Sequence, residues 1–148
     1  MNQPQTNHEL FEDIRREHEE LRELLGEIHR TLANRLAAVA SVSAMLVSLG
    51  DHIKTHFEEE ETTGLFDNIV DRAPRLSERI DALRTEHQQL LAVVRQLNEV
   101  ARNGDGSVDW WQRLNTDFHK FSAELMHHET AENDILLEAY TDDIGASD

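Results

Sequence analysis

Apolar residues recur every three or four positions through four long stretches of this chain. The chain has two prolines, Pro4 and Pro74, so few residues interrupt a helix. This period places the apolar residues of each stretch on one face of an α-helix. Sustained alternation of apolar and polar residues, which is typical of half-buried strands, does not occur in the sequence. The pattern predicts helices at roughly 7–34, 40–63, 74–102 and 108–131, with a short helix at about 133–140.

The segments between these stretches read as connections. The run from Gly64 to Ala73 predicts a turn, because Pro74 suits the first turn of a following helix. Asn103 to Ser107 holds two glycines and predicts a loop. Four amphipathic helices with short connections favour an all-α fold, an up-down-up-down four-helix bundle with a short C-terminal extension. A length of 148 residues suits a single domain over 1–148.

Composition narrows the classes of function. The chain has no cysteine, so disulfides, thiolate metal sites and thiol catalysis are excluded. A formal net charge of −16 disfavours nucleic acid and anionic membranes as partners. The longest apolar stretch is too short to cross a bilayer, and the polar N-terminus does not resemble a signal peptide, so we expect a cytoplasmic protein. The sequence favours no particular oligomeric state.

A histidine motif repeats in the two halves of the chain. His56 and Glu60 stand four residues apart, and His128 and Glu132 repeat this spacing 72 residues later. A lone histidine precedes each pair, and these two are His18 and His87, 69 residues apart. All six side chains fall in phase with the apolar faces of their predicted helices. The repeat therefore predicts a pseudo-twofold, two-metal site inside the bundle.

The charge of the six residues supports a bound cation. A buried carboxylate without a partner costs several kcal/mol. None of the fourteen Lys and Arg residues falls in phase within the apolar faces, so an internal salt bridge is a poor alternative. Imidazole and carboxylate without sulfur suit iron, manganese or zinc. Two carboxylates can bridge ions roughly 3.5–4 Å apart. A bridging oxo or hydroxo group would leave each ion one open position for dioxygen, nitric oxide or peroxide.

Two further residues lie beside the predicted site. His52 precedes His56 by four residues, and Glu124 precedes His128 by four. They could orient the ligand imidazoles or act as additional ligands, because metal sites are commonly supported by such partners. The alternative is that both are half-exposed polar residues near the bundle surface.

The sequence resembles the hemerythrin-like family, the HHE cation-binding domains, in an ordered set of motifs over roughly Leu10 to Tyr140. The matching segments are Glu17-His18-x-x-Leu21, His56-x-x-x-Glu60-Glu61-x-x-Gly64-Leu65-Phe66, Glu86-His87-x-x-Leu90 and His128-Glu129-x-x-Glu132-Asn133. The resemblance implies a di-iron centre. It implies the terminal ligands His18, His56, His87 and His128 and the bridging ligands Glu60 and Glu132.

The motifs depart from those of oxygen-carrying hemerythrins. Such proteins have a second histidine four residues after the one on helix three, where this chain has Leu91. They have an aspartate five residues after the histidine on helix four, where this chain has Asn133. The set is closer to the bacterial hemerythrin-like proteins of the repair-of-iron-centres type. This argues against simple reversible oxygen carriage.

Three functions remain as hypotheses. The first is a non-haem di-iron protein that binds or reacts with dioxygen, nitric oxide or peroxide, including catalase-like peroxide breakdown. The second is an iron-binding sensor, iron donor or storage module without catalytic turnover. The third is a plain helical interaction domain in which the inward histidines and glutamates are satisfied core residues.

Overall fold

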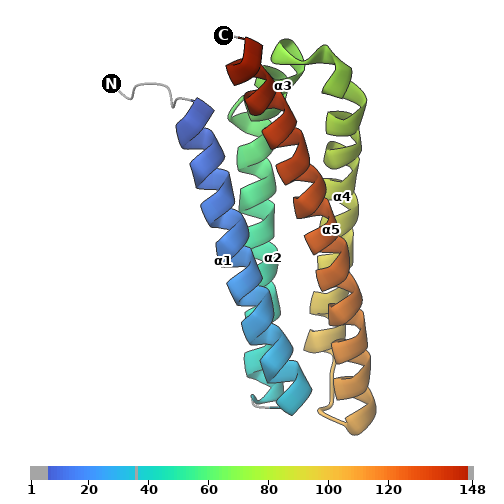
Figure 1. The fold of residues 1–148 in the computed structure, drawn as a ribbon. Coiled ribbons are helices and arrows are strands. Elements are labelled where there is room, and N and C mark those ends of the chain that lie inside the picture. The colour runs from blue at the N-terminus through green and yellow to red at the C-terminus, as the bar shows by residue number, and fades with distance from the viewer. Residues whose placement is uncertain (1–6, 36, 147–148) are drawn as a thin grey trace, which may run out of the picture.

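The structure is a computed structural model that describes residues 7–35 and 37–146. Four long helices, α1 (Asn7–Asn34), α2 (Val39–Thr62), α4 (Ser77–Arg102) and α5 (Val108–Ala146), lie side by side along one axis (Figure 1). A short helix, α3 (Leu65–Arg72), and a 3-10 turn, η1 (Pro74–Leu76), connect α2 to α4. The described residues contain no strand, which confirms the predicted all-α class and a helical bundle.

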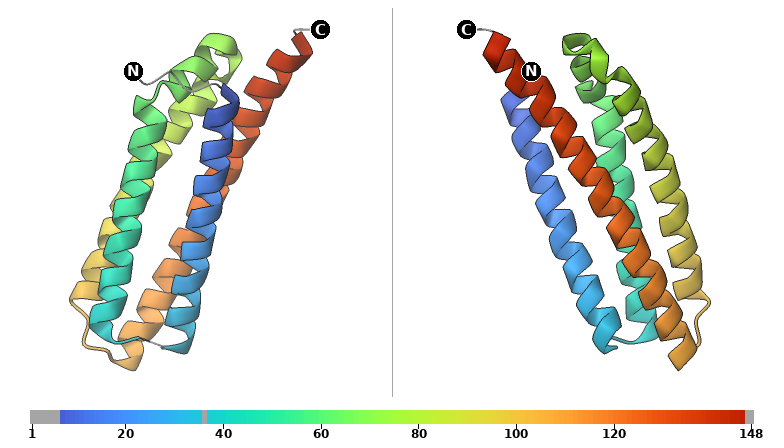
Figure 2. Two further views of the ribbon diagram at one scale, coloured as in Figure 1. Left: turned by 90° about the vertical axis from the view of Figure 1, so that its left-hand side faces the viewer. Right: turned by 45° about the vertical axis from the view of Figure 1, so that its right-hand side comes forward.

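Each long helix packs against two others. α1 contacts α2 and α5, and α4 also contacts α2 and α5, so the four helices surround a common interior. The colour gradient shows that successive long helices run in opposite directions (Figures 1 and 2). No helix among the described residues combines the length and apolar character that a membrane span requires.

The C-terminal helix differs from the prediction. The sequence suggested that a helix ends near residue 131 and that a separate short helix follows at 133–140. The structure instead shows one helix, α5, from Val108 to Ala146. Ile135, Leu136 and Ala139 are buried and continue the apolar face of α5 beyond the predicted break. The C-terminal extension is therefore part of α5.

The connection between α2 and α4 also differs from the prediction. The predicted turn from Gly64 to Ala73 contains the eight-residue helix α3. Gly64 has a φ of 84°, a left-handed conformation that glycine adopts without the steric cost of a Cβ atom. Leu65, Phe66 and Ile69 are buried on one face of α3. The following long helix begins at Ser77 rather than at 74, because residues 74–76 form the 3-10 turn.

The loop between α4 and α5 is held by side chains. The Ser107 hydroxyl accepts a hydrogen bond from the backbone N–H of Trp110 at 3.2 Å and so caps the start of α5. The Trp110 indole N–H donates to the carbonyl of Val100 at 2.9 Å. Gly104 lies against this indole, since a Cβ atom there would come within 1.8 Å of Nε1. The loop thus ties the ends of two long helices together.

The interior has two hydrophobic clusters with polar residues between them. The first core cluster includes Leu21, Ile53, Leu90 and Leu125 and continues toward the α1–α2 and α4–α5 loops. The second core cluster is formed at the opposite end by α3 and parts of the long helices. Its members are Ile14, Leu65, Phe66, Ile69, Leu76, Ile80, Leu83, Ile135, Leu136 and Ala139. The sequence-predicted site lies at the junction of the two clusters.

Candidate metal centre

Six polar side chains from the four long helices form one buried layer, which we call the polar layer. None of the six exposes more than 3% of its surface. They are His18, His56, Glu60, His87, His128 and Glu132. These are the six residues that the sequence predicted as metal ligands, and the structure brings all of them together.

Helical spacing positions the two histidine–glutamate pairs. On α2, His56 Nε2 lies 2.9 Å from Glu60 Oε1. On α5, His128 Nε2 lies 3.3 Å from Glu132 Oε2. Residues four apart share one face of a helix, so each pair points into the same interior as its apolar neighbours.

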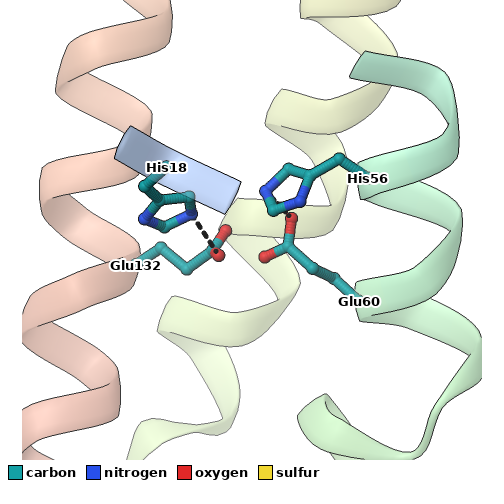
Figure 3. A group of neighbouring side chains, drawn as sticks. All are labelled: His18, His56, Glu60 and Glu132. Atoms are coloured by element: carbon teal, nitrogen blue, oxygen red, sulfur yellow. Dashed lines mark hydrogen bonds and ion pairs between the residues drawn. The ribbon is translucent and has the colours of Figure 1, made fainter. Parts of the chain in front are cut away.

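Contacts between helices close the layer. His18 Nε2 on α1 lies 3.1 Å from Glu132 Oε1 on α5. His87 Nε2 on α4 lies 3.8 Å from Glu60 Oε1 on α2. The carboxylates of Glu60 and Glu132 point toward one another between α2 and α5 (Figure 3).

The donor atoms fall into two groups that share one residue. One atom from each member of a group lies within 4.8 Å of the corresponding atoms of the others. The first group is His18, His56, Glu60 and Glu132, and the second is His87, His128 and Glu132. Glu132 belongs to both groups, whereas Glu60 belongs to the first group only.

The outward ring nitrogens are held by residues of neighbouring helices. His56 Nδ1 lies 2.5 Å from Glu17 Oε2, and His128 Nδ1 lies 2.8 Å from Glu86 Oε1. An ionised carboxylate can only accept a hydrogen bond, so each Nδ1 carries the proton. The lone pair of each Nε2 then faces the polar layer, which is the arrangement of a metal-binding imidazole.

The other two imidazoles have similar partners. His18 Nδ1 lies 3.0 Å from Asn133 Oδ1. His87 Nδ1 lies 3.7 Å from Glu61 Oε2, which is longer than a hydrogen bond. Asn133 directly follows Glu132, and Glu61 directly follows Glu60. These two outer partners therefore occupy equivalent positions in the two halves of the chain, as the six residues of the polar layer do.

The sequence reasoning chose other residues for this supporting role. Glu124 is exposed, and His52 is half-buried in a cleft beside the polar layer. The hydrogen bonds of His56 and His128 are instead accepted by Glu17 and Glu86. The repeated dipeptides Glu17-His18 and Glu86-His87 could have indicated these two glutamates in the sequence. Each glutamate, however, accepts a hydrogen bond from a histidine of the adjacent helix and not from the histidine that follows it in the sequence.

Sequence reasoning also missed a further buried carboxylate. Glu129 on α5 is 2% exposed, and neither of its carboxylate oxygens has a hydrogen bond. Burial raises the pKa of this side chain above its usual range. Arg22 Nε on α1 lies 4.0 Å from Glu129 Oε2. This carboxyl group lies close enough to His18 and His56 to interact with them electrostatically.

The two central carboxylates differ in proton affinity. Burial and the adjacent Glu132 raise the pKa of Glu60 well above its usual range. Burial also acts to raise the pKa of Glu132, but its polar interactions with Glu60, His128 and His18 outweigh burial and hold it well below its usual range. Without a cation, Glu60 therefore binds a proton more readily than Glu132 does.

Two imidazoles of the polar layer bind protons more tightly than usual. Burial acts to lower the pKa of His56, but the hydrogen bond to Glu17 outweighs it and the pKa is raised. Burial acts in the same way on His128, and its interaction with Glu132 raises the pKa. The site therefore attracts positive charge, either as protons or as a cation.

Several buried nitrogen and oxygen atoms of the polar layer have no hydrogen-bond partner, so they are available to bind a metal ion. Both oxygens of Glu60, Oε2 of Glu132 and the Nε2 atoms of His87 and His128 are buried and make no hydrogen bond of acceptable geometry. Satisfied core residues, the structural alternative, would not leave so many donor and acceptor atoms unpaired. Imidazole nitrogen and carboxylate oxygen together suit iron, manganese or zinc.

Aromatic side chains shield one side of the layer. The ring of Phe57 stacks on His87 with centroids 3.9 Å apart and planes 9° apart. Phe66 from α3 lies over His87 at 5.8 Å. These apolar walls keep water from part of the site, and a dry surrounding strengthens the electrostatic interactions within it.

Comparisons with known proteins agree with this geometry. The sequence profile described as hemerythrin HHE cation-binding domain matches residues 9–140, which is most of the chain. Comparisons with curated proteins and with solved structures found no significant match.

Proposed function

Because the chain belongs to the hemerythrin HHE cation-binding domain family, whose members bind metal ions and usually iron, we propose that it is a non-haem di-iron protein. The four imidazoles of the polar layer would be the terminal ligands, two for each ion, and Glu60 and Glu132 would be the carboxylate ligands that the two ions share. Dioxygen, nitric oxide or peroxide is the small ligand that this centre binds or reacts with.

One observation supports the proposal above the others. Buried Nε2 and carboxylate oxygen atoms from four helices converge on one place, and several of them have no hydrogen-bond partner. A divalent or trivalent cation removes the cost of burying these groups. Arg22, beside Glu129 and half exposed, lies outside the polar layer and does not supply this positive charge.

The residues around the polar layer favour a small ligand. Phe57 and Phe66 cover His87, and both rings are almost completely buried. Bound iron would supply reversible redox chemistry and a coordination position for the ligand. The protein would orient the imidazoles through Glu17 and Glu86 and exclude bulk water through its aromatic walls.

Metal analysis of the purified protein tests the proposal. We expect two irons per chain, a visible absorption band from the iron centre, and loss of iron in Glu60→Ala. Oxygen release from added hydrogen peroxide would assign peroxide breakdown. Bound iron without any turnover would favour the sensor, donor or storage function instead. Protein that binds no iron, manganese or zinc after reconstitution would refute the metal site.

A further inference from the structure

We propose that the cleft between α1 and α2 is the route by which metal cations reach the polar layer from solvent. This inference rests on the proposed function, because it concerns how the same site is loaded. It assigns a role to exposed carboxylates that are not themselves candidate ligands.

The cleft has an acidic wall and leads to a buried imidazole of the polar layer. Its volume is about 400 Å³, and its floor is His56, which is 3% exposed. We call it the acidic cleft after the four carboxylates that line it. These are Glu17 and Glu20 from α1 and Asp51 and Glu59 from α2. The half-buried imidazole of His52 also lines it, and imidazole nitrogen is a common ligand of transition-metal ions.

A second, smaller cavity adjoins the acidic cleft. It is a small space of about 60 Å³ that shares Glu17 and Glu59 with the acidic cleft. Glu60 of the polar layer also lines it. This side chain is 2% exposed, and neither of its oxygens has a hydrogen-bond partner. The path thus ends on an unsatisfied carboxylate that is able to accept a cation.

Asp13 also lines the small cavity, but it does not add free negative charge. Its carboxylate is ion-paired with Arg16 at 2.6 Å. Glu17 is likewise paired, with His56, so the free negative charge of the route comes from Glu20, Asp51 and Glu59.

The corresponding cleft in the other half of the molecule is less acidic, because two carboxylates line it, Glu86 and Glu124, where the acidic cleft has four. It lies between α4 and α5, has a volume of about 360 Å³ and is lined by His128. In the internal repeat, Gln89 replaces Glu20 and Ala123 replaces Asp51. If the acidic cleft reflected only the net charge of the chain, the two clefts would be similarly acidic. The difference indicates a function for one side.

Electrostatic focusing explains how such a cleft would work. Like charges that line a concave surface with low-dielectric walls raise the local concentration of an oppositely charged ion. This effect speeds association and weakens as ionic strength rises. The acidic cleft would therefore change the rate of metal uptake much more than the final amount of bound metal.

Stopped-flow uptake of Co²⁺ by the metal-free protein tests the proposal. The visible absorption of Co²⁺ bound to imidazole and carboxylate reports loading, and metal analysis gives the ions bound per chain at the end point. For the double variant Glu20→Gln/Asp51→Asn, we expect uptake at low salt to slow by about threefold to tenfold, with unchanged stoichiometry. The difference should shrink at high salt.

A matched control separates local from global charge. The variant Asp117→Asn/Glu124→Gln removes two carboxylates between α4 and α5, so its net charge equals that of the test variant. We expect its uptake rate to stay close to that of the unmodified protein. Equal rates in all three proteins with full Co²⁺ binding would overturn the route and leave the metal site intact. Equal slowing of both variants would also overturn it. Failure of every protein to bind Co²⁺ would refute the proposed function itself.

Discussion

At the scale of single residues, the outward nitrogens of two imidazoles are fixed by glutamates from neighbouring helices. Glu17 on α1 holds His56 on α2, and Glu86 on α4 holds His128 on α5. The sequence analysis instead proposed His52 and Glu124 for this role, because each lies one turn from His56 or His128 on the same helix. Which residues meet across two helices depends on their relative axial shift, and helical periodicity alone does not specify that shift.

Replacing Glu86 with alanine tests this arrangement. The variant Glu86→Ala removes the acceptor of the His128 Nδ1 proton, so the ring loses its fixed orientation and some basicity. We expect metal affinity to fall about 10-fold to 100-fold, as is common for such supporting partners. Competition against a chelator of known affinity would measure the change.

Glu124→Ala is the matched control, because Glu124 is exposed and lines the same cleft as Glu86. Its metal affinity should stay close to that of the unmodified protein. If both variants lost affinity to the same extent, the hydrogen bond to His128 would not be the cause.

At the scale of helices, the apolar periodicity predicted the four long helices. It did not predict helix α3 or the unbroken C-terminal part of α5. Helix α3 has only eight residues, which is too short for a periodic pattern to stand out, and flanking Gly64 and Pro74 resemble turn signals. Helix α5 continues through residues 131–133 because no glycine or proline interrupts it there and its apolar face persists. Packing between α3 and α5 in the second core cluster supports both elements.

Adjacent leucines on α5 allow a direct test of this packing. Leu136 is fully buried in the second core cluster, whereas Leu137 is 51% exposed. We expect Leu136→Ala to lower the free energy of unfolding by about 2–5 kcal/mol, because it removes buried methyl groups and leaves a cavity. Leu137→Ala should change it by less than about 0.5 kcal/mol.

Denaturant unfolding of the metal-free proteins would give both values, because metal binding would otherwise add its own stabilisation. Equal effects of the two substitutions would mean that the end of α5 does not pack against the second core cluster.

At the scale of the whole molecule, the polar layer joins two hydrophobic clusters, so its charge state affects the stability of the entire bundle. The sequence predicted all six members of the polar layer, because histidine and glutamate residues rarely fall on the apolar faces of four helices in the same protein. It could not predict the proton distribution within the polar layer. That distribution depends on distances between side chains of different helices.

The raised and lowered pKa values set the pH dependence of the metal-free protein. His56 and His128 have raised pKa values, so their stabilising contributions are complete below the unfolded value of 6.5 and are lost as pH rises through the folded values. Glu60 also has a raised pKa, so ionising this buried carboxyl group lowers the stability as pH rises through its folded value. Glu17 and Glu132 have lowered pKa values, so their contributions are present above 4.5 and are lost as pH falls through the folded values.

Metal binding should offset the loss of stability that the metal-free protein shows as pH rises. A cation competes with protons for the same nitrogens and oxygens, so it binds more tightly as pH rises. We expect the Tm difference between loaded and metal-free protein to be larger at about pH 8 than at about pH 6. Thermal melts with and without a chelator would measure it. A difference that narrows as pH rises would contradict the assigned protonation of Glu60 and the two histidines.

The internal repeat of the polar layer bears on how such a centre could have arisen. The hairpin of α1 and α2 contributes two imidazoles and one carboxylate, and the hairpin of α4 and α5 contributes the same set. Two copies of either half, joined across a twofold axis, would supply the full complement of donors. A homodimeric ancestor of half the length, followed by gene duplication and fusion, would account for the pairing of Glu17 with His56 and of Glu86 with His128.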